Sequence, residues 1–213
     1  RVQTCALPIY TSPSVRPTFD RERAAASRFI VDVLRPKDLA MIIEFERTVT
    51  LAQDLTDDTH MLQKAIDELE LGPIRDGGTS LYDAVYLAAR EKLKDEAGRK
   101  AIILISDGED TSSRIRGEEA MVAVHRSDAV IYSVSVGRPS RFFAGGRRGN
   151  RGGSGGDENT MRRLAGETGG SHFTIRERDD FERAFKQIND ELRNQYSLAY
   201  MSTNRSEEHT SEL

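Results

Sequence analysis

Three clusters of oxygen-bearing side chains occur at points where the chain is expected to turn. The first holds two hydroxyls one residue apart, Ser12 and Ser14, and the second sets Thr79 ahead of a predicted helix. The third begins at Asp107, which follows the uninterrupted apolar run 101–105. Hydroxyl and carboxylate oxygens are the ligands that a hard cation such as Mg²⁺ prefers. If the three clusters meet at one edge of a sheet, they predict a cation site there.

Each cluster also has a purely local interpretation. Ser14 could cap the helix that follows it, and Thr79 could be only an N-cap. Asp107 could simply shape the turn after its strand. Ligands for softer metals do not gather in the body of the chain, where the histidines are scattered: His60, His125 and His172.

The apolar patterns predict the elements that position these residues. Short buried or alternating runs predict strands at 39–45, 48–55, 100–106, 129–136, 171–175 and 196–201. Helical periodicity predicts helices at 19–34, 61–71, 81–96, 117–126, 159–168 and 181–194. Strands that alternate with helices predict an α/β fold with a doubly wound, mostly parallel sheet and helices on both faces. The strand at 48–55 is expected to be an antiparallel edge strand.

The composition is that of a soluble globular protein, with 37% hydrophobic and 31% charged residues among 213. The net charge of -4 gives no nucleic-acid signature, and no apolar run approaches the roughly 20 residues that span a bilayer. The Arg- and Gly-rich stretch 138–157 leaves two interpretations open. It is either a flexible solvated insert or a basic flap that recruits an acidic partner or a nucleic-acid backbone.

Both ends of the chain look foreign to the domain. The last nine residues, RSEEHTSEL at 205–213, match the translation of a sequencing-library adapter, and VQTCALPI at 2–9 matches its partner adapter. The alternative is that both are ordinary native ends. We expect residues 1–9 and 205–213 to be non-native tails around an N-terminally truncated domain at 10–204. Cys5, the only cysteine, then says nothing about the redox compartment.

The clusters in combination resemble a von Willebrand factor type A (VWA) domain, and bacterial VWA-related proteins in particular, over about 10–204. That family's metal-ion-dependent adhesion site has a D-x-S-x-S motif after the first strand, a later Thr and a late Asp. Ser12 and Ser14 in YTSPS stand at the two serines, Thr79 in DGGTSLYDAV at the threonine, and Asp107 in ILISDGEDTS at the late aspartate. The segments TGGSHF and LRNQYSLAY also resemble those bacterial members.

The resemblance implies a Rossmann-like fold and a non-enzymatic protein-binding module. Mg²⁺, or Mn²⁺ or Ca²⁺, would be held by Ser12, Ser14, Thr79 and Asp107, and an Asp or Glu carboxylate of a partner protein would complete its coordination. The resemblance also implies a first strand between those at 39–45 and 100–106. Related bacterial proteins are often exported, which makes an exported or periplasmic location an expectation by resemblance.

Tyr10 departs from the family pattern, because it stands where the motif has its first Asp. Residue 10 is the junction codon, and overwriting the first base of GAC or GAT with the adapter's T produces a Tyr codon. A phenol with a pKa of about 10 supplies no ionised ligand near neutral pH. We therefore expect weak or absent metal binding by this sequence and a destabilised fold.

Two other functions remain as alternatives. The first is a Mg²⁺-dependent hydrolase or phosphoryl-transfer enzyme in which Asp107 is a nucleophile or a ligand. No P-loop motif occurs to support it. The second is a structural scaffold that binds no metal.

Overall fold

A six-stranded sheet forms the centre of the molecule in the computed structural model, which describes residues 3–72, 78–136, 156–177 and 179–194. Its strand order is β3-β2-β1-β4-β5-β6. The strands are β1 (Gln3–Tyr10), β2 (Leu39–Phe45), β3 (Val49–Thr56), β4 (Arg99–Ser106), β5 (Ala129–Ser135) and β6 (His172–Thr174). Only β3 pairs antiparallel, with β2, at the edge of the described sheet. The predicted fold class and antiparallel edge strand are confirmed.

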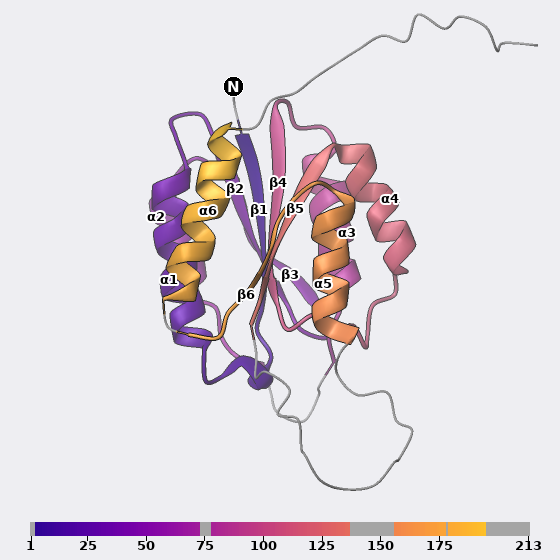
Figure 1. Cartoon of the computed structure of the whole chain (residues 1–213). Coiled ribbons are helices and arrows are strands. Elements are labelled where there is room, and N and C mark those ends of the chain that lie inside the picture. The colour runs from indigo at the N-terminus through magenta and orange to yellow at the C-terminus, as the bar shows by residue number, and fades with distance from the viewer. Residues whose placement is uncertain (1–2, 73–77, 137–155, 178, 195–213) are drawn as a thin grey trace, which may run out of the picture.

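Helices cover both faces of this sheet (Figure 1), so the sheet is doubly wound as predicted. On one side lie α1 (Phe19–Val33), α2 (Thr59–Asp67) and α6 (Asp180–Asn194). On the other lie α3 (Leu81–Tyr86), α4 (Gly117–Ser127) and α5 (Gly156–Glu167). Apolar strand residues that are almost fully inaccessible fill the space between the layers, as expected for a sheet buried on both faces.

Strand β1 occupies the central slot between β2 and β4. Every residue from Gln3 to Tyr10 is buried, so the segment expected to be a non-native tail contributes the middle strand of the sheet. Pairing with β2 is continuous from Thr4 to Tyr10, whereas pairing with β4 is interrupted at Leu7 and Pro8. Proline has no backbone N–H to donate, so Pro8 accounts for a gap in a central ladder.

Several element boundaries differ from the predictions. The helix predicted at 81–96 begins as α3 but continues as a π-helical segment, η2 (Leu87–Leu93), and the loop at 11–18 contains a short 3₁₀ helix, η1 (Pro13–Val15). Helix α2 ends at Asp67, earlier than predicted, and starts where the Asp58 carboxylate accepts hydrogen bonds from the amides of His60 and Met61. The strand predicted at 196–201 and the Arg- and Gly-rich stretch up to residue 155 lie outside the described residues.

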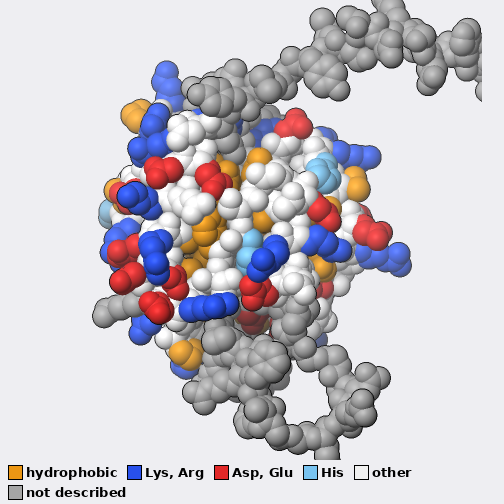
Figure 2. All heavy atoms as spheres, viewed as in Figure 1, with side chains coloured by type: hydrophobic (Ala, Val, Ile, Leu, Met, Phe, Trp, Pro, Cys, Tyr) orange, Lys and Arg blue, Asp and Glu red, His pale blue; other side chains and the backbone are white. Residues whose placement is uncertain are grey.

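Acidic and basic side chains mingle over the face of the molecule shown in Figure 2, rather than separating into fields of one sign. This mixture fits the small net charge of the chain. Within the described ranges, none of the helices is both long enough and apolar enough to cross a membrane.

Candidate metal centre

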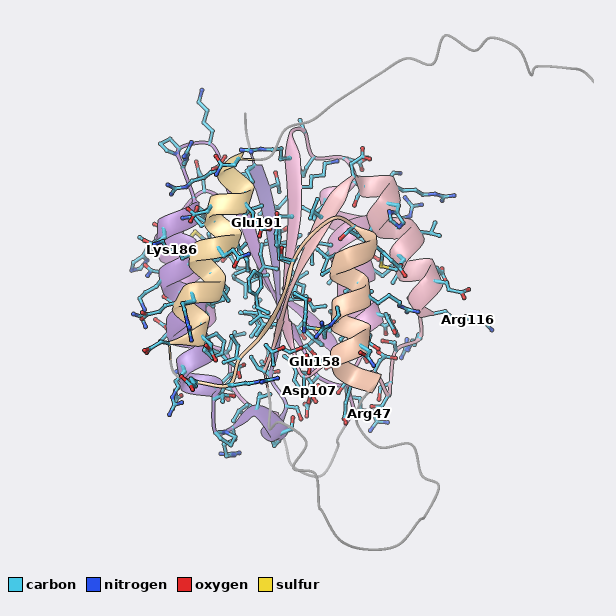
Figure 3. All side chains as sticks on the ribbon, in the orientation of Figure 1. Arg47, Asp107, Arg116, Glu158, Lys186 and Glu191 are labelled. Carbon is cyan, nitrogen blue, oxygen red and sulfur yellow. The ribbon has the colours of Figure 1, made fainter. Side chains whose placement is uncertain are left out.

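The predicted site residues come from three segments that meet at the carboxyl edge of the parallel strands. Tyr10 ends β1, and Asp107 directly follows β4, the strand paired beside it. Ser14 lies in η1 and Ser12 lies directly before it, while Thr79 lies in the turn before α3. Figure 3 shows Asp107 at the lower end of the sheet, where these strands finish.

Asp107 makes the turn after β4 and also faces the serine segment. Its Oδ1 accepts a hydrogen bond from the Glu109 amide at 3.2 Å, while its Oδ2 accepts one from Ser14 Oγ at 3.3 Å. The chain can reverse here because Gly108 adopts a φ of 86°, a conformation that strains residues with a side chain. Asp107 therefore shapes the turn through its Oδ1, as the local interpretation expected. Its Oδ2 contacts Ser14 in a different segment of the chain.

The serine segment is held in a tight turn. The Val15 amide donates to the Ser12 carbonyl at 3.1 Å, and Thr18 donates to the Val15 carbonyl from both its amide and its hydroxyl. Ser12 is buried, and Ser14 is exposed at the surface of the turn. Ser14 does not cap α1, because the N-cap residue of that helix is Thr18.

Tyr10 and Thr79 form the second contact between segments. The Tyr10 phenol oxygen lies 2.9 Å from Thr79 Oγ1, and either group can be the donor. The Tyr10 ring is 3% exposed and packs at 5.5 Å from the Phe45 ring in a tilted arrangement. The phenol thus reaches the threonine that the resemblance assigns to the metal.

Thr79 does not cap α3, so its alternative interpretation is wrong. The N-cap position of α3 is Ser80, whose side chain makes no capping hydrogen bond. The amides of Leu81 and Tyr82 donate instead to Asp110 Oδ1, at 3.0 and 3.4 Å. This assigns Asp110, part of the acidic cluster after β4, to helix capping and leaves Asp107 as the carboxylate at the edge.

Glu22 is a buried carboxyl beside this edge that the sequence interpretation missed. Its side chain on α1 is fully inaccessible, and its Oε1 lies 2.6 Å from Thr18 Oγ1. Burial, together with the smaller effect of the charge of Asp107, raises the pKa of Glu22 to about 8. A signal was present, because Glu22 falls between Phe19 and Ala26 on the apolar stripe of the helix, where an acid is unusual.

The donor set fits a hard cation, though with little negative charge. The residues expected to hold it offer three hydroxyls and one carboxylate, and Glu22 is mostly neutral at pH 7 because its pKa is about 8. Among the described residues, no three His, Cys, Asp or Glu side chains gather into a metal-binding group. A divalent ion at this edge would therefore meet one ionised protein ligand.

These features define a class of protein: a doubly wound α/β domain with hydroxyls and one carboxylate gathered at the carboxyl edge of its central strands. The family model of the von Willebrand factor type A domain matches residues 9–191. The chain belongs to that family, as the motifs predicted.

Solved structures of similar fold include bacterial proteins. A conserved hypothetical protein BatB from Bacteroides thetaiotaomicron is 20% identical with a TM-score of 0.66, and the match covers 91% of this chain and 98% of that one. An aerotolerance-related membrane protein from Bacteroides fragilis is also 20% identical, with a TM-score of 0.64 and coverage of 90% and 100%. At these identities the likeness shows the fold alone.

A mussel protein of similar fold has been solved with zinc in its adhesion-site motif. The proximal thread matrix protein 1 of the mussel byssus, with a zinc-occupied adhesion-site motif, is 16% identical with a TM-score of 0.67. The match covers 88% of this chain and 45% of the mussel chain. A search of curated proteins finds no match.

Proposed function

We propose that this domain binds other proteins through a divalent cation, and that it is not an enzyme. The observation that carries the proposal is the convergence of distant segments at one edge: Ser14 bonds Asp107, and the residue at position 10 bonds Thr79. Membership of the VWA family and the zinc-bearing neighbour support it. Export or a periplasmic location belongs to the same proposal, supported by the membrane-related neighbour.

The chain's own groups would each have a defined role. The hydroxyls of Ser12, Ser14 and Thr79 and the carboxylate of Asp107 would hold Mg²⁺ or Mn²⁺, and a bound ion supplies an electrophilic position for a further oxygen ligand. A partner's Asp or Glu carboxylate is the ligand of matching charge and hardness. With only one protein carboxylate on the ion, an anionic partner ligand is also favoured electrostatically.

Tyr10 impairs the site for two reasons. The phenol adds no negative charge at neutral pH, and its buried ring fills space beside Thr79 that an aspartate would leave for an ion and its waters. We therefore propose that this sequence binds the cation weakly or not at all, and that an aspartate at position 10 restores binding.

The Mg²⁺-dependent hydrolase remains the alternative, and no contact among the described residues favours it. Asp107 accepts hydrogen bonds from the Glu109 amide and from Ser14. These contacts position a carboxylate as a ligand equally well as they position a nucleophile. Hydrolysis of p-nitrophenyl phosphate by the Mg²⁺-loaded Tyr10→Asp variant, lost on Asp107→Asn, would replace the binding proposal with the enzymatic one.

The test measures water on bound Mn²⁺ in the Tyr10→Asp variant by proton relaxation. A short peptide with a central Glu is expected to displace a metal-bound water and lower the relaxation enhancement, while the same peptide with Gln leaves it unchanged. Asp107→Asn in the same background is expected to lose the Mn²⁺ signal itself. Tight Mn²⁺ binding with no response to the Glu peptide would contradict the proposed binding mode.

A further inference from the structure

A second group of metal-ligating atoms lies where α5 meets β6. His172 Nε2 is 3.4 Å from Thr174 Oγ1 and 3.8 Å from Glu158 Oε1, and the last two atoms are 3.1 Å apart. Figure 3 shows Glu158 at the lower end of α5, toward the carboxyl edge of the sheet. Three donors of different chemistry thus form a small triangle between a helix and a strand.

The dimensions of this triangle match the coordination shell of a zinc-class ion. Zinc binds His nitrogen at about 2.0–2.1 Å and carboxylate oxygen at about 2.0–2.2 Å, usually in a tetrahedron. Ligands at that distance from a tetrahedral ion are about 3.3 Å from one another. The separations of 3.1, 3.4 and 3.8 Å scatter around this value, so one point can lie within bonding distance of all three atoms.

Hydrogen bonding fixes the tautomer of His172 that such an ion needs. Ser133 Oγ, fully buried in β5, lies 2.9 Å from the Met161 carbonyl and 2.8 Å from His172 Nδ1. The carbonyl only accepts, so the serine uses its single proton there and must accept from Nδ1–H. The lone pair of the imidazole is then on Nε2, facing Glu158 and Thr174. Such a hydrogen bond on the far nitrogen is the usual support of a metal-binding histidine.

A buried hydroxyl without a partner lies on the same side of the sheet. Ser135 is 8% exposed, and its Oγ has no hydrogen-bond partner among the described residues. It is the register partner of Thr174 and lies two residues beyond Ser133, so all three project toward α5. An orphaned buried hydroxyl is costly unless something completes it, and an ion-bound water is a suitable partner.

One cation already competes for the carboxylate. The Arg162 guanidinium donates to Glu158 Oε1 at 2.8 Å, but its side chain is 64% exposed and that of Glu158 is 43% exposed. An exposed ion pair of this kind on a helix contributes little to stability. Arg162 can therefore move into solvent when a divalent ion takes its place.

We propose that His172, Glu158 and Thr174 form a second cation site of the zinc class, with water in the remaining position. The site is independent of the hydroxyl site at Asp107 and stands whether or not that site binds a metal. Since its ligands come from α5 and from the three-residue strand β6, an ion there fastens the helix to the edge of the described sheet.

The experiment titrates the full chain with Zn²⁺ by calorimetry and with Co²⁺ by visible absorption. We expect one zinc site that survives Asp107→Asn, and the intense bands of four-coordinate Co²⁺. His172→Ala and, as a milder surface change, Glu158→Gln should each abolish that site, whereas Ser133→Ala should weaken it roughly 10–100-fold. His125→Ala, which removes an exposed histidine from α4, is the matched control and should leave the site unchanged.

Several outcomes would overturn the proposal. One is the absence of stoichiometric zinc binding by the unmodified chain at neutral pH. Another is binding that persists at the same affinity in His172→Ala and Glu158→Gln, or that disappears with Asp107→Asn, since the ion would then lie elsewhere. A loss of zinc binding in the His125→Ala control would likewise contradict it.

Discussion

Restoring an aspartate at position 10 tests the proposed adhesion site directly. Tyr10 is 3% exposed, its ring packs on Phe45, and its phenol contacts Thr79. Replacing it with Asp removes a buried ring, leaves space next to Thr79 and places a shorter carboxylate at the end of β1, the strand beside β4. Two opposing effects follow, one on the fold without metal and one on the fold with it.

Without metal, Tyr10→Asp is expected to unfold more easily. Deleting a large buried aromatic side chain typically costs about 3–5 kcal/mol, and the isolated carboxylate is poorly solvated there. With Mg²⁺ at about 100 times its dissociation constant, binding to the folded state alone returns about 2.7 kcal/mol. The variant is therefore expected to have low stability without Mg²⁺ and to recover a substantial part of the lost stability with it.

The assay is urea unfolding with and without Mg²⁺, paired with calorimetric titration of the ion. Tyr10→Asn is the matched control, because it leaves the same space as Asp but carries no charge. We expect a Mg²⁺-dependent gain in the free energy of unfolding for Tyr10→Asp and none for Tyr10→Asn or the unmodified chain. Asp107→Asn added to Tyr10→Asp is expected to abolish the gain.

Two results would refute the reasoning. If the unmodified chain binds Mg²⁺ tightly, then Tyr10 does not impair the site. If Tyr10→Asn gains as much from Mg²⁺ as Tyr10→Asp, then the space matters and the charge does not, and the proposed ligand role of an aspartate at this position is wrong.

Three further predictions concern the core. Burial raises the pKa of Glu22 from 4.5 to about 8, so its contribution to stability is complete below pH 4.5 and is lost as the pH rises through 8. Glu22→Gln should therefore match the unmodified chain at pH 5 and exceed it at pH 9 by on the order of a few kcal/mol in urea unfolding; equal stabilities at pH 9 would contradict this. Pro8→Val supplies the missing amide of β1 and should raise the free energy of unfolding by about 1 kcal/mol, whereas a loss would show that proline is not the cause of the gap. Burial raises the pKa of Cys5 to about 12, so a thiol reagent should modify it only after unfolding, and rapid labelling of the native protein would disprove its burial.

The architecture was predictable because its signals are local and repeated. Continuous apolar runs gave the parallel strands, and alternation with helical segments gave the doubly wound sheet. The position of β1 between β2 and β4 was predicted only from the family resemblance, not from the apolar pattern. The π-helical segment Leu87–Leu93 was not predictable, since its periodicity cannot be told from that of an ordinary helix over seven residues.

The candidate metal centre was predictable only in part. Asp107 and Ser14 were expected to converge if both lay at the carboxyl edge, and the structure places Ser14 Oγ 3.3 Å from Asp107 Oδ2. Glu22 was missed because a single acidic residue within an apolar stripe does not by itself indicate a buried carboxyl. His172 was dismissed as a scattered histidine, since its partner Glu158 is on another element and nothing in the sequence couples them.

Some buried polar atoms make no hydrogen bond within the described residues and therefore lower the stability of the fold. The buried Ser133 hydroxyl forms hydrogen bonds with the Met161 carbonyl and with His172 Nδ1, and these offset the free-energy cost of burying it. Ser135 Oγ and Glu22 Oε2 are buried without a hydrogen-bond partner among the described residues. An apolar residue would be more stable at either position unless the oxygen has a use. Ser135 ends β5 beside β4, and Glu22 senses the charge of Asp107, so both belong to the carboxyl edge. Stability alone does not explain these two oxygens, whereas ions and their bound waters at this edge would.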